Sequence, residues 1–287
     1  MKKTILIFGN GYVSKFLSKS LNDLGWLVYC TSRQVELEKS FVCETIKIIN
    51  FFDPKLYEII KSANIILSTV PIDNEFIDPV LEHYFGIISQ EEFEWVGYLS
   101  STGVYGDHDG KWVDEQTKCK PSNCKSKIRL LAEEKWLGLY IKYKIPIHIF
   151  RLSGIYGPGK NCLQEIQNGK NFTIIKKDQY FSRIHVVDIC QAMIASINSP
   201  APGELYNVSD DEPAQINVVQ QFGARLLNRK QLVEIPFEEA NLSKQAKMFF
   251  DDNKKVSSNK ILKSLNINWK YPNYRIGLLQ GCLPYLL

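Results

Sequence analysis

The chain has 287 residues, of which 45% are hydrophobic and 23% charged, and its formal net charge is +4. This length allows one large or two modest domains, and the composition is typical of an ordinary soluble globular protein. The small net charge argues against nucleic-acid binding, so the lysine doublets Lys176–Lys177 and Lys254–Lys255 are interpreted as solvated faces.

The chain carries no signal for a membrane or for an oxidising compartment. No apolar run reaches the ~18 residues of a membrane span. The start, MKKTILIFGNGY, resembles a signal peptide only superficially, because its apolar part ends after five residues. Seven scattered cysteines without a C-x-x-C pair fit reduced thiols. We therefore expect a cytoplasmic protein, and four histidines without spaced partners predict no metal site.

The first 33 residues contain the strongest motif in the chain. The apolar run Thr4–Phe8 predicts a buried parallel strand, and apolar residues at helical spacing then continue until Gly25. The run Trp26–Tyr29 returns as the next strand. Strand, glycine turn, helix and returning strand are the context in which a G-x-G-x-x-G pattern indicates a dinucleotide site.

The turn itself reads Gly9-Asn10-Gly11-Tyr12-Val13-Ser14. Gly9 permits the tight turn, and Gly11 lets backbone amides approach a pyrophosphate at the positive end of the helix. The third position is Ser14, which is small enough for close packing of helix against strand. We predict that residues Gly9 to Val13 bind the cofactor.

The end of the second strand indicates which dinucleotide is preferred. An NAD-preferring site usually has an acidic residue about 20 residues after the glycine turn, and this chain has Thr31-Ser32-Arg33 there instead. Ser32 and Arg33 suit a ribose 2′-phosphate, so NADP(H) is favoured over NAD(H). The alternative is that Arg33 is merely solvated.

Three further strands are predicted at Thr45–Ile49, Ile65–Pro71 and Glu94–Leu99. Asn50 could pair with an adenine edge, while Asp53-Pro54 reads as a helix N-cap followed by a proline at the first helical position. Ser68 and Thr69 lie where ligands bind in open α/β sheets.

From the fifth strand onward the chain resembles the extended short-chain dehydrogenase/reductases, which include nucleotide-sugar epimerases and dehydratases. The matching segments are SSTGVYG at 100–106, Pro121 leading to Lys127, Ala132-Glu133, RLSGIYGPG at 151–159, IHVVD at 184–188, LYNV at 205–208 and WKYP at 269–272. The occurrence of these segments in the family's order makes the resemblance strong and extends it over most of the chain.

The resemblance implies a doubly wound parallel Rossmann sheet of the α/β class with a smaller, mainly helical C-terminal substrate lobe. The alternation of apolar runs with amphipathic segments supports the same class independently. We place the NAD(P)-binding domain at 1–208, with 156–183 contributing to the substrate lobe, and the lobe itself at 209–287.

The family's catalytic residues are only partly present. Family members use a Ser or Thr, a Tyr and a Lys in Y-x-x-x-K; these positions correspond to Ser101, Asn123 and Lys127. An amide exchanges no proton near neutral pH, so the usual acid/base group is missing. Tyr105, Cys124 and Lys125 are candidate substitutes, although Tyr105 is favoured as a packing residue. The chain thus resembles an atypical subgroup that lacks the tyrosine, in which Arg129 and Glu133 are further family residues that hold the site together.

The substrate side departs from the family as well. Many members carry an arginine four residues before the His of I-H-V-x-D, where this chain has Phe181; Arg183 follows two residues later. In an extended segment both side chains point the same way, so Arg183 could reach an anionic substrate. A solvated or core-bridging arginine is equally compatible with the sequence. The resemblance makes His185 and Asp188 structural rather than catalytic.

Two functions remain open from the sequence. The first is an NADP(H)-dependent reductase or epimerase-like enzyme acting on a small carbonyl or hydroxyl compound, which could be anionic or nucleotide-linked. The second is a catalytically inactive NADP(H)-binding sensor or scaffold. The expected partner is a small-molecule substrate, a homodimer is considered, and neither nucleic acid nor membrane is expected.

Overall fold

The computed structural model describes residues 3–35, 43–72 and 77–286. The chain forms two compact units, each assembled from separate stretches. The first unit comprises 1–100, 127–151 and 193–206, and the second comprises 101–126, 152–192 and 207–287. The segment 156–183, predicted to contribute to the C-terminal lobe, lies in the second unit. The segment 101–126 also belongs to this unit, and the sequence did not indicate that.

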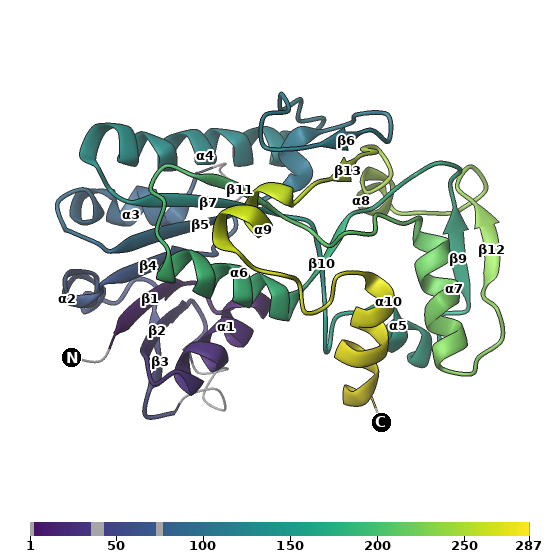
Figure 1. Ribbon diagram of the computed structural model, residues 1–287, viewed down its shortest axis with the longest axis horizontal. Helices are drawn as coiled ribbons and strands as arrows, with labels where there is room; N and C mark the ends of the chain where they lie inside the picture. The colour runs from purple at the N-terminus through teal and green to yellow at the C-terminus, as the bar shows by residue number, and fades with distance from the viewer. Residues whose placement is uncertain (1–2, 36–42, 73–76, 287) are drawn as a thin grey trace. The chain divides into compact units, whose positions relative to one another are not determined.

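A seven-stranded sheet runs in the order β11-β7-β5-β4-β1-β2-β3 (Figure 1). Its strands are β1 (Thr4–Phe8), β2 (Leu27–Ser32), β3 (Ile46–Asn50), β4 (Ile65–Ser68), β5 (Trp95–Ser101), β7 (Ile147–Leu152) and β11 (Leu205–Val208). β1 pairs in parallel with both β2 and β4, so the chain reverses its direction of winding between β1 and β4. This confirms the predicted doubly wound α/β fold and places a switch point at the carboxyl ends of β1 and β4.

Helices cover both faces of this sheet. They are α1 (Tyr12–Asp23), α2 (Leu56–Ser62), α3 (Pro79–Ile88), α4 (Cys124–Tyr143) and α6 (Val186–Asn198). One buried cluster joins α2, α3 and α4 to the sheet through residues such as Ile60, Tyr84 and Trp136. On the other face α1 packs against β2 and buries Leu17 and Leu21. Burial of each large apolar side chain contributes about 1.5–3 kcal/mol, which stabilises the packing of these helices on the sheet.

The prediction that Asp53 is a helix N-cap is wrong, because the N-cap position of α2 is Lys55. Helix α2 begins at Leu56, and Asp53 instead closes the preceding turn by accepting the Lys55 N–H at 2.9 Å. The role of Asp53 is therefore local, in the turn. Asp78 caps α3 by accepting the N–H groups of Val80 and Leu81, with Pro79 at the first helical position.

The second unit contains short helices and short paired strands. Its helices are α5 (Cys162–Gln167), α7 (Ile216–Leu226), α8 (Lys244–Met248), α9 (Asn259–Leu265) and α10 (Tyr274–Ile276), followed by a π-helical turn (Gly277–Cys282) and a 3₁₀ turn (Leu283–Tyr285). Its strands are β6 (Trp112–Val113), β8 (Gly154–Tyr156), β9 (Phe172–Ile175), β10 (Arg183–His185), β12 (Val233–Pro236) and β13 (Lys255–Val256). They pair as β10-β8, β12-β9 and β13-β6, so the expected helical lobe also holds parallel strand pairs.

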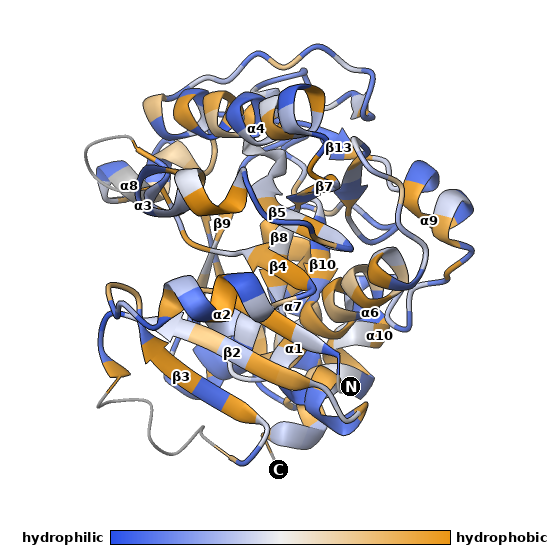
Figure 2. Cartoon of the chain, turned by 90° about the vertical axis from the view of Figure 1, so that its left-hand side faces the viewer, coloured by the Kyte–Doolittle hydropathy of each residue, from blue (hydrophilic) through white to orange (hydrophobic). Residues whose placement is uncertain are grey.

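Hydropathy follows these elements. Figure 2 shows hydrophobic residues concentrated on the strands, whereas α4 carries hydrophobic and hydrophilic residues mixed along its length. On α4, Trp136 and Leu139 are buried, while Leu131 and Ile141 are exposed. Among the described residues, no helix combines the length and apolar character that crossing a membrane requires.

Candidate functional site

The glycine turn connects β1 to α1 at the switch point. Gly9 has φ +106°, and a Cβ there would lie 2.5 Å from the Thr69 hydroxyl oxygen, so only glycine fits. The Gly9 N–H donates to the Thr31 hydroxyl (2.9 Å), and the Ser14 hydroxyl lies 2.9 Å from that of Thr69. The ends of β1, β2 and β4 thus hold the turn in one conformation, with Gly11 as the N-cap of α1.

Two polar side chains near this turn are buried without a hydrogen-bond partner in the described part of the chain. They are the Asn10 amide, at both Oδ1 and Nδ2, and the Ser68 hydroxyl. Thr69, by contrast, donates its hydroxyl to the Phe8 carbonyl and is used within the fold. A buried polar group left unpaired costs about 1–3 kcal/mol, so Asn10 and Ser68 mark a place where a polar ligand fits.

The residues that suggested cofactor preference lie at the ends of β2 and β3. The Ser32 hydroxyl accepts the Gln34 N–H at 3.1 Å, and Arg33 is exposed. Asn50 is also exposed, and its Oδ1 accepts the Phe52 N–H at 2.9 Å. No acidic residue ends β2, as read from the sequence.

The carboxyl end of β5 carries Ser101. Its hydroxyl oxygen accepts the Gly103 N–H at 3.1 Å and so caps the 3₁₀ turn Thr102–Tyr105. Tyr105 is fully buried and donates its hydroxyl to Asn207 at 2.8 Å, which gives it the packing role favoured by the sequence. Gly106 ends the motif with φ +71°, where a Cβ would lie 1.8 Å from the Lys120 carbonyl oxygen.

Asn123 occupies the start of α4. Its Oδ1 accepts the Ser126 N–H at 2.9 Å, the geometry of a helix cap. Lys127 follows four residues later, one helical turn onward on the same face, and its side chain is exposed. The residue predicted to stand in place of the tyrosine therefore caps α4, a structural role that spacing alone did not reveal.

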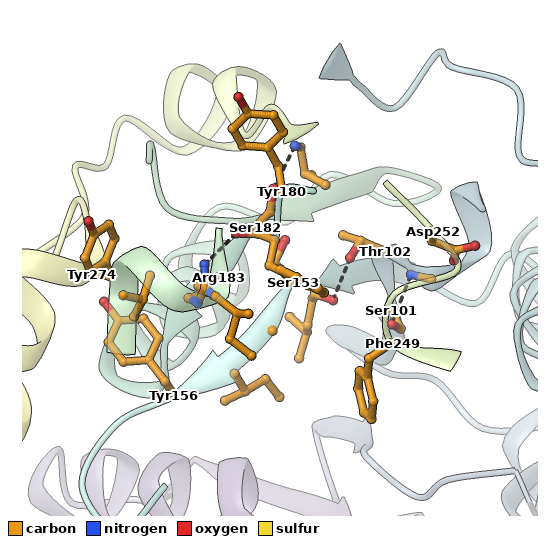
Figure 3. A pocket seen from close by; sticks show the side chains of 18 of the residues that line it. Ser101, Thr102, Ser153, Tyr156, Tyr180, Ser182, Arg183, Phe249, Asp252 and Tyr274 are labelled. Carbon is orange, nitrogen blue, oxygen red and sulfur yellow. Dashed lines mark hydrogen bonds between the residues drawn. The ribbon is translucent and has the colours of Figure 1, made fainter. Parts of the chain in front are cut away.

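A cavity of about 680 Å³ lies within the second unit (Figure 3). Ser101 and Asn123 line it, together with Ser153, Arg183 and the segment 248–250. Four basic side chains line the cavity, Lys125, Lys160, Arg183 and Lys254, against two acidic ones, Glu165 and Asp252. Glu165 is already paired with Lys170 (2.7 Å), so the cavity is electropositive and suits an anion.

One end of the cavity is formed by Arg183, Tyr156 and Tyr274 (Figure 3). Arg183 donates through Nη1 to the carbonyls of Phe181 (2.7 Å) and Ala214 (3.0 Å), which fixes the guanidinium plane. Burial lowers the pKa of Arg183, and the nearby Asp210 carboxyl opposes that shift. The Tyr274 hydroxyl is buried and has no hydrogen-bond partner in the described residues.

Lys254 and Asp252 also line the cavity, and the sequence missed them. The interpretation of Lys254 as part of a solvated face is wrong, because its side chain is only 11% exposed and its Nζ lies 3.4 Å from Asp252 Oδ2. Burial lowers the pKa of the Lys254 ammonium, while the carboxylates of Asp252 and Asp107 raise it to a smaller extent. Nothing in a K-K doublet distinguishes a buried lysine from a solvated one.

A buried ion pair supports the end of β5 from within the first unit. Arg151 on β7 donates to both carboxylate oxygens of Glu133 on α4, with the shortest contact at 2.7 Å. Ser100, the neighbour of Ser101, donates its hydroxyl to the same carboxylate at 2.5 Å. Arg129, one turn earlier on α4, donates to the Leu99 carbonyl at 3.1 Å. These contacts fix the strand end that carries Ser101.

His185 and Asp188 are used within the fold. His185 accepts the Val187 N–H through Nδ1, and burial lowers the pKa of its imidazole to about 4. Asp188 accepts the N–H groups of Lys270 (2.7 Å) and Tyr271 (3.1 Å), and burial raises the pKa of its carboxyl to about 6. Among the described residues, no group of three or more His, Cys, Asp or Glu side chains is placed to hold a metal ion.

A model of the NAD dependent epimerase/dehydratase family matches residues 87–209. Protein YeeZ of Escherichia coli (strain K12) is 24% identical over 295 residues, which cover 94% of this chain and 97% of that protein.

Two solved structures resemble the chain over nearly its whole length. A functionally unknown conserved protein from Silicibacter pomeroyi is 38% identical with a TM-score of 0.89, and the match covers 97% of this chain and 98% of that one. The dTDP-glucose 4,6-dehydratase of Bacillus anthracis, solved in complex with NAD, has a TM-score of 0.80 at 15% identity, covering 97% of this chain and 95% of that one.

Proposed function

We propose that the chain, whose residues 87–209 match a model of the NAD dependent epimerase/dehydratase family, is an NADP(H)-dependent reductase or epimerase-like enzyme. Its substrate is a small anionic carbonyl or hydroxyl compound, with nucleotide-linked sugars as one class. The observation that carries this proposal is the electropositive cavity that joins Ser101 and Asn123 to Arg183. An inactive sensor has no need of such a cavity beside the Ser101 hydroxyl.

The residues of the first unit fit a dinucleotide. The unpartnered Asn10 amide and Ser68 hydroxyl, and the uncapped N-terminus of α1 at Gly11, are what a pyrophosphate and its ribose require. In our proposal the backbone amides of Tyr12 and Val13 face the pyrophosphate, Lys127 holds the nicotinamide ribose and Asn50 lies at the adenine. Ser32 and Arg33 hold the 2′-phosphate, which favours NADP(H). A bound nicotinamide supplies or accepts the hydride.

Ser101 orients the reacting oxygen of the substrate. Its own oxygen already accepts the Gly103 N–H, so its O–H is directed by that contact and remains available as a donor. Asn123 cannot exchange a proton and holds the first turn of α4 beside the same cavity. A proton donor must therefore come from elsewhere in the cavity wall.

Arg183 binds the anionic group of the substrate. The carbonyls of Phe181 and Ala214 hold its Nη1 edge, which pre-organises the guanidinium for a carboxylate or phosphate. The guanidinium stays protonated even where burial lowers its pKa, because its ordinary pKa lies so far above neutral. Among the described residues that line the cavity, Arg183 is the one that carries a guanidinium.

The test is a panel of anionic carbonyl compounds, free and nucleotide-linked, each paired with an uncharged analogue. Oxidation of NADPH is followed by the loss of its absorbance. We expect turnover with an anionic member, and we expect Arg183→Met to raise KM for it at least tenfold with little effect on the uncharged analogue. Arg229→Met, an exposed arginine in the second unit, is the matched control. Tight NADPH binding with no turnover on any member would favour the sensor instead.

A further inference from the structure

We propose that Lys254, paired with Asp252, is the proton donor and acceptor that replaces the missing tyrosine. This inference rests on the proposed function, since it concerns the same cavity. It gives the enzyme an acid/base group that the family motif does not supply.

The Lys254–Asp252 pair lies in the wall of the candidate substrate cavity. Lys254 and Asp252 line the same cavity as Ser101 and Asn123. Figure 3 draws Asp252 at the end of the cavity that holds Ser101 and Thr102, with Arg183, Tyr156 and Tyr274 toward the opposite end. A substrate whose anionic group lies at Arg183 therefore directs its other end toward the ion pair and the Ser101 hydroxyl.

The side chains of Lys254 and Asp252 are largely shielded from solvent, and their hydrogen-bonding capacity is only partly used. The side chains of Lys254 and Asp252 are 11% and 15% exposed, and their Nζ–Oδ2 distance is 3.4 Å. The other carboxylate oxygen, Asp252 Oδ1, is buried and has no hydrogen-bond partner in the described residues. A substrate hydroxyl would complete this arrangement as a third member.

Hydrogen bonds from other segments hold the backbone around the pair. Gln179, itself almost fully buried, donates its side-chain amide to the Asp252 carbonyl at 2.7 Å. The Asn253 N–H donates to Asp107 at 2.9 Å, and the Asn253 carbonyl accepts the His108 N–H at 3.0 Å. These contacts come from two other segments of the second unit, so the ion pair is held in place before substrate arrives.

The surroundings of Lys254 suit an ammonium that transfers a proton. Burial lowers the pKa of Lys254, which brings an ammonium closer to the range where it can give up a proton. The titratable groups facing Lys254 are Asp252 on its own segment and Asp107 from the turn after the 3₁₀ helix. The phenols of Tyr156 and Tyr274 have raised pKa values because they are buried, and Figure 3 shows the Tyr180 hydroxyl pointing away from Ser101.

In the direction of reduction, a bound reduced nicotinamide would supply a hydride to the substrate carbonyl carbon, and the carbonyl oxygen would take a proton from the Lys254 ammonium. The N–H bond breaks, its electron pair stays on the amine, and the O–H bond of the alcohol forms. Solvent then returns a proton to the Lys254 amine, and oxidation runs through the same transfers in reverse.

The deciding experiment measures the proton affinity of Lys254 directly. The protein is labelled with trace acetic anhydride over a range of pH, and acetylation of each lysine is quantified by mass spectrometry. We expect Lys254 to reach half-maximal reactivity at a lower pH than exposed Lys247. In Asp252→Asn the midpoint should fall further, because the carboxylate that raises the Lys254 pKa has been removed. A Lys254 midpoint equal to that of Lys247 overturns the proposal, whether or not a substrate is known.

Turnover supplies the second measurement. Lys254→Met should lower kcat by about 10²–10⁴-fold with a small change in KM, and Lys254→Arg should be equally impaired because guanidinium does not give up its proton. Lys247→Met should match the wild type. Adding Asn123→Tyr to Lys254→Met should restore part of the rate by returning a phenol to the family's position.

The two proposals fail in different ways. Unchanged kcat in Lys254→Met overturns the role of Lys254 while leaving the enzyme proposal intact. Absence of turnover in the wild type counts against the proposed function, and the labelling midpoint still decides whether Lys254 is poised for proton transfer. Loss of NADPH binding in Lys254→Met would show a structural role and so would also overturn the proposal.

Discussion

Removal of one partner from the buried Glu133–Arg151 pair should destabilise the first unit strongly. Glu133 is 2% and Arg151 5% exposed, and the carboxylate accepts three contacts from the guanidinium and one from Ser100. In Glu133→Gln the guanidinium stays buried without its counter-charge, which costs about 3–5 kcal/mol. That is a large share of the roughly 5–15 kcal/mol that stabilises a folded protein.

The assay is equilibrium urea unfolding followed by two probes, far-UV circular dichroism and tryptophan fluorescence. Glu134→Gln, the exposed neighbour on α4, is the matched control and should lie within about 0.5 kcal/mol of the wild type. The double variant Glu133→Met with Arg151→Met should be less destabilised than either single variant, because no unpaired charge remains buried. The reasoning is refuted if Glu133→Gln costs under about 1 kcal/mol, or if the double variant costs the sum of the singles.

Three further outcomes are expected. Arg33→Ala should weaken NADPH binding about tenfold or more in calorimetric titration and leave NADH affinity unchanged; equal losses for both would contradict the 2′-phosphate role. Lys127→Ala should reduce cofactor affinity and activity together, whereas Ser101→Ala should lower kcat with cofactor affinity retained, and the reverse pattern would exchange their roles. Burial lowers the pKa of His148 to about 4. The unfolded state therefore binds the extra proton between pH 4 and 6.5, and stability is lost as the pH falls through that window. As the pH falls from 6.5 to 4, the unfolding free energy of the wild type should therefore decrease relative to that of His148→Phe. A difference between the two proteins that does not change with pH would contradict this role of His148.

The fold and the glycine turn could be predicted from the sequence because their signals are local. The β1 apolar run, the glycine turn and the periodicity of α1 lie within 25 consecutive residues. Gly9 illustrates the reason: its positive φ and the missing Cβ follow from backbone sterics that only glycine satisfies. Strand ends were less well predicted, since β2 and β5 continue to Ser32 and Ser101 through backbone pairing that is indifferent to side-chain polarity.

The sequence predicted Ser101 and Lys127 as site residues by motif and placed Asn123 at the position of the family's tyrosine, and these assignments stay predictions. It could not show that Asn123 caps α4, because capping depends on where the helix starts in three dimensions. The role of Arg183 could not be decided for a similar reason. The local sequence does not distinguish an arginine that is solvated from one that bridges core elements or binds a ligand. Its contacts with Phe181 and Ala214 fix the guanidinium in the cavity wall.

The cavity could be found only in the tertiary structure, because the segments that line it lie far apart in the chain. Ser101 and Lys254 are separated by about one hundred and fifty residues, and no local pattern connects them. Burial changed the chemistry of Lys254 through the loss of water around its ammonium and through the proximity of Asp252. Periodicity and motif spacing report what a residue does within its own helix or turn, whereas desolvation depends on every segment that packs around it.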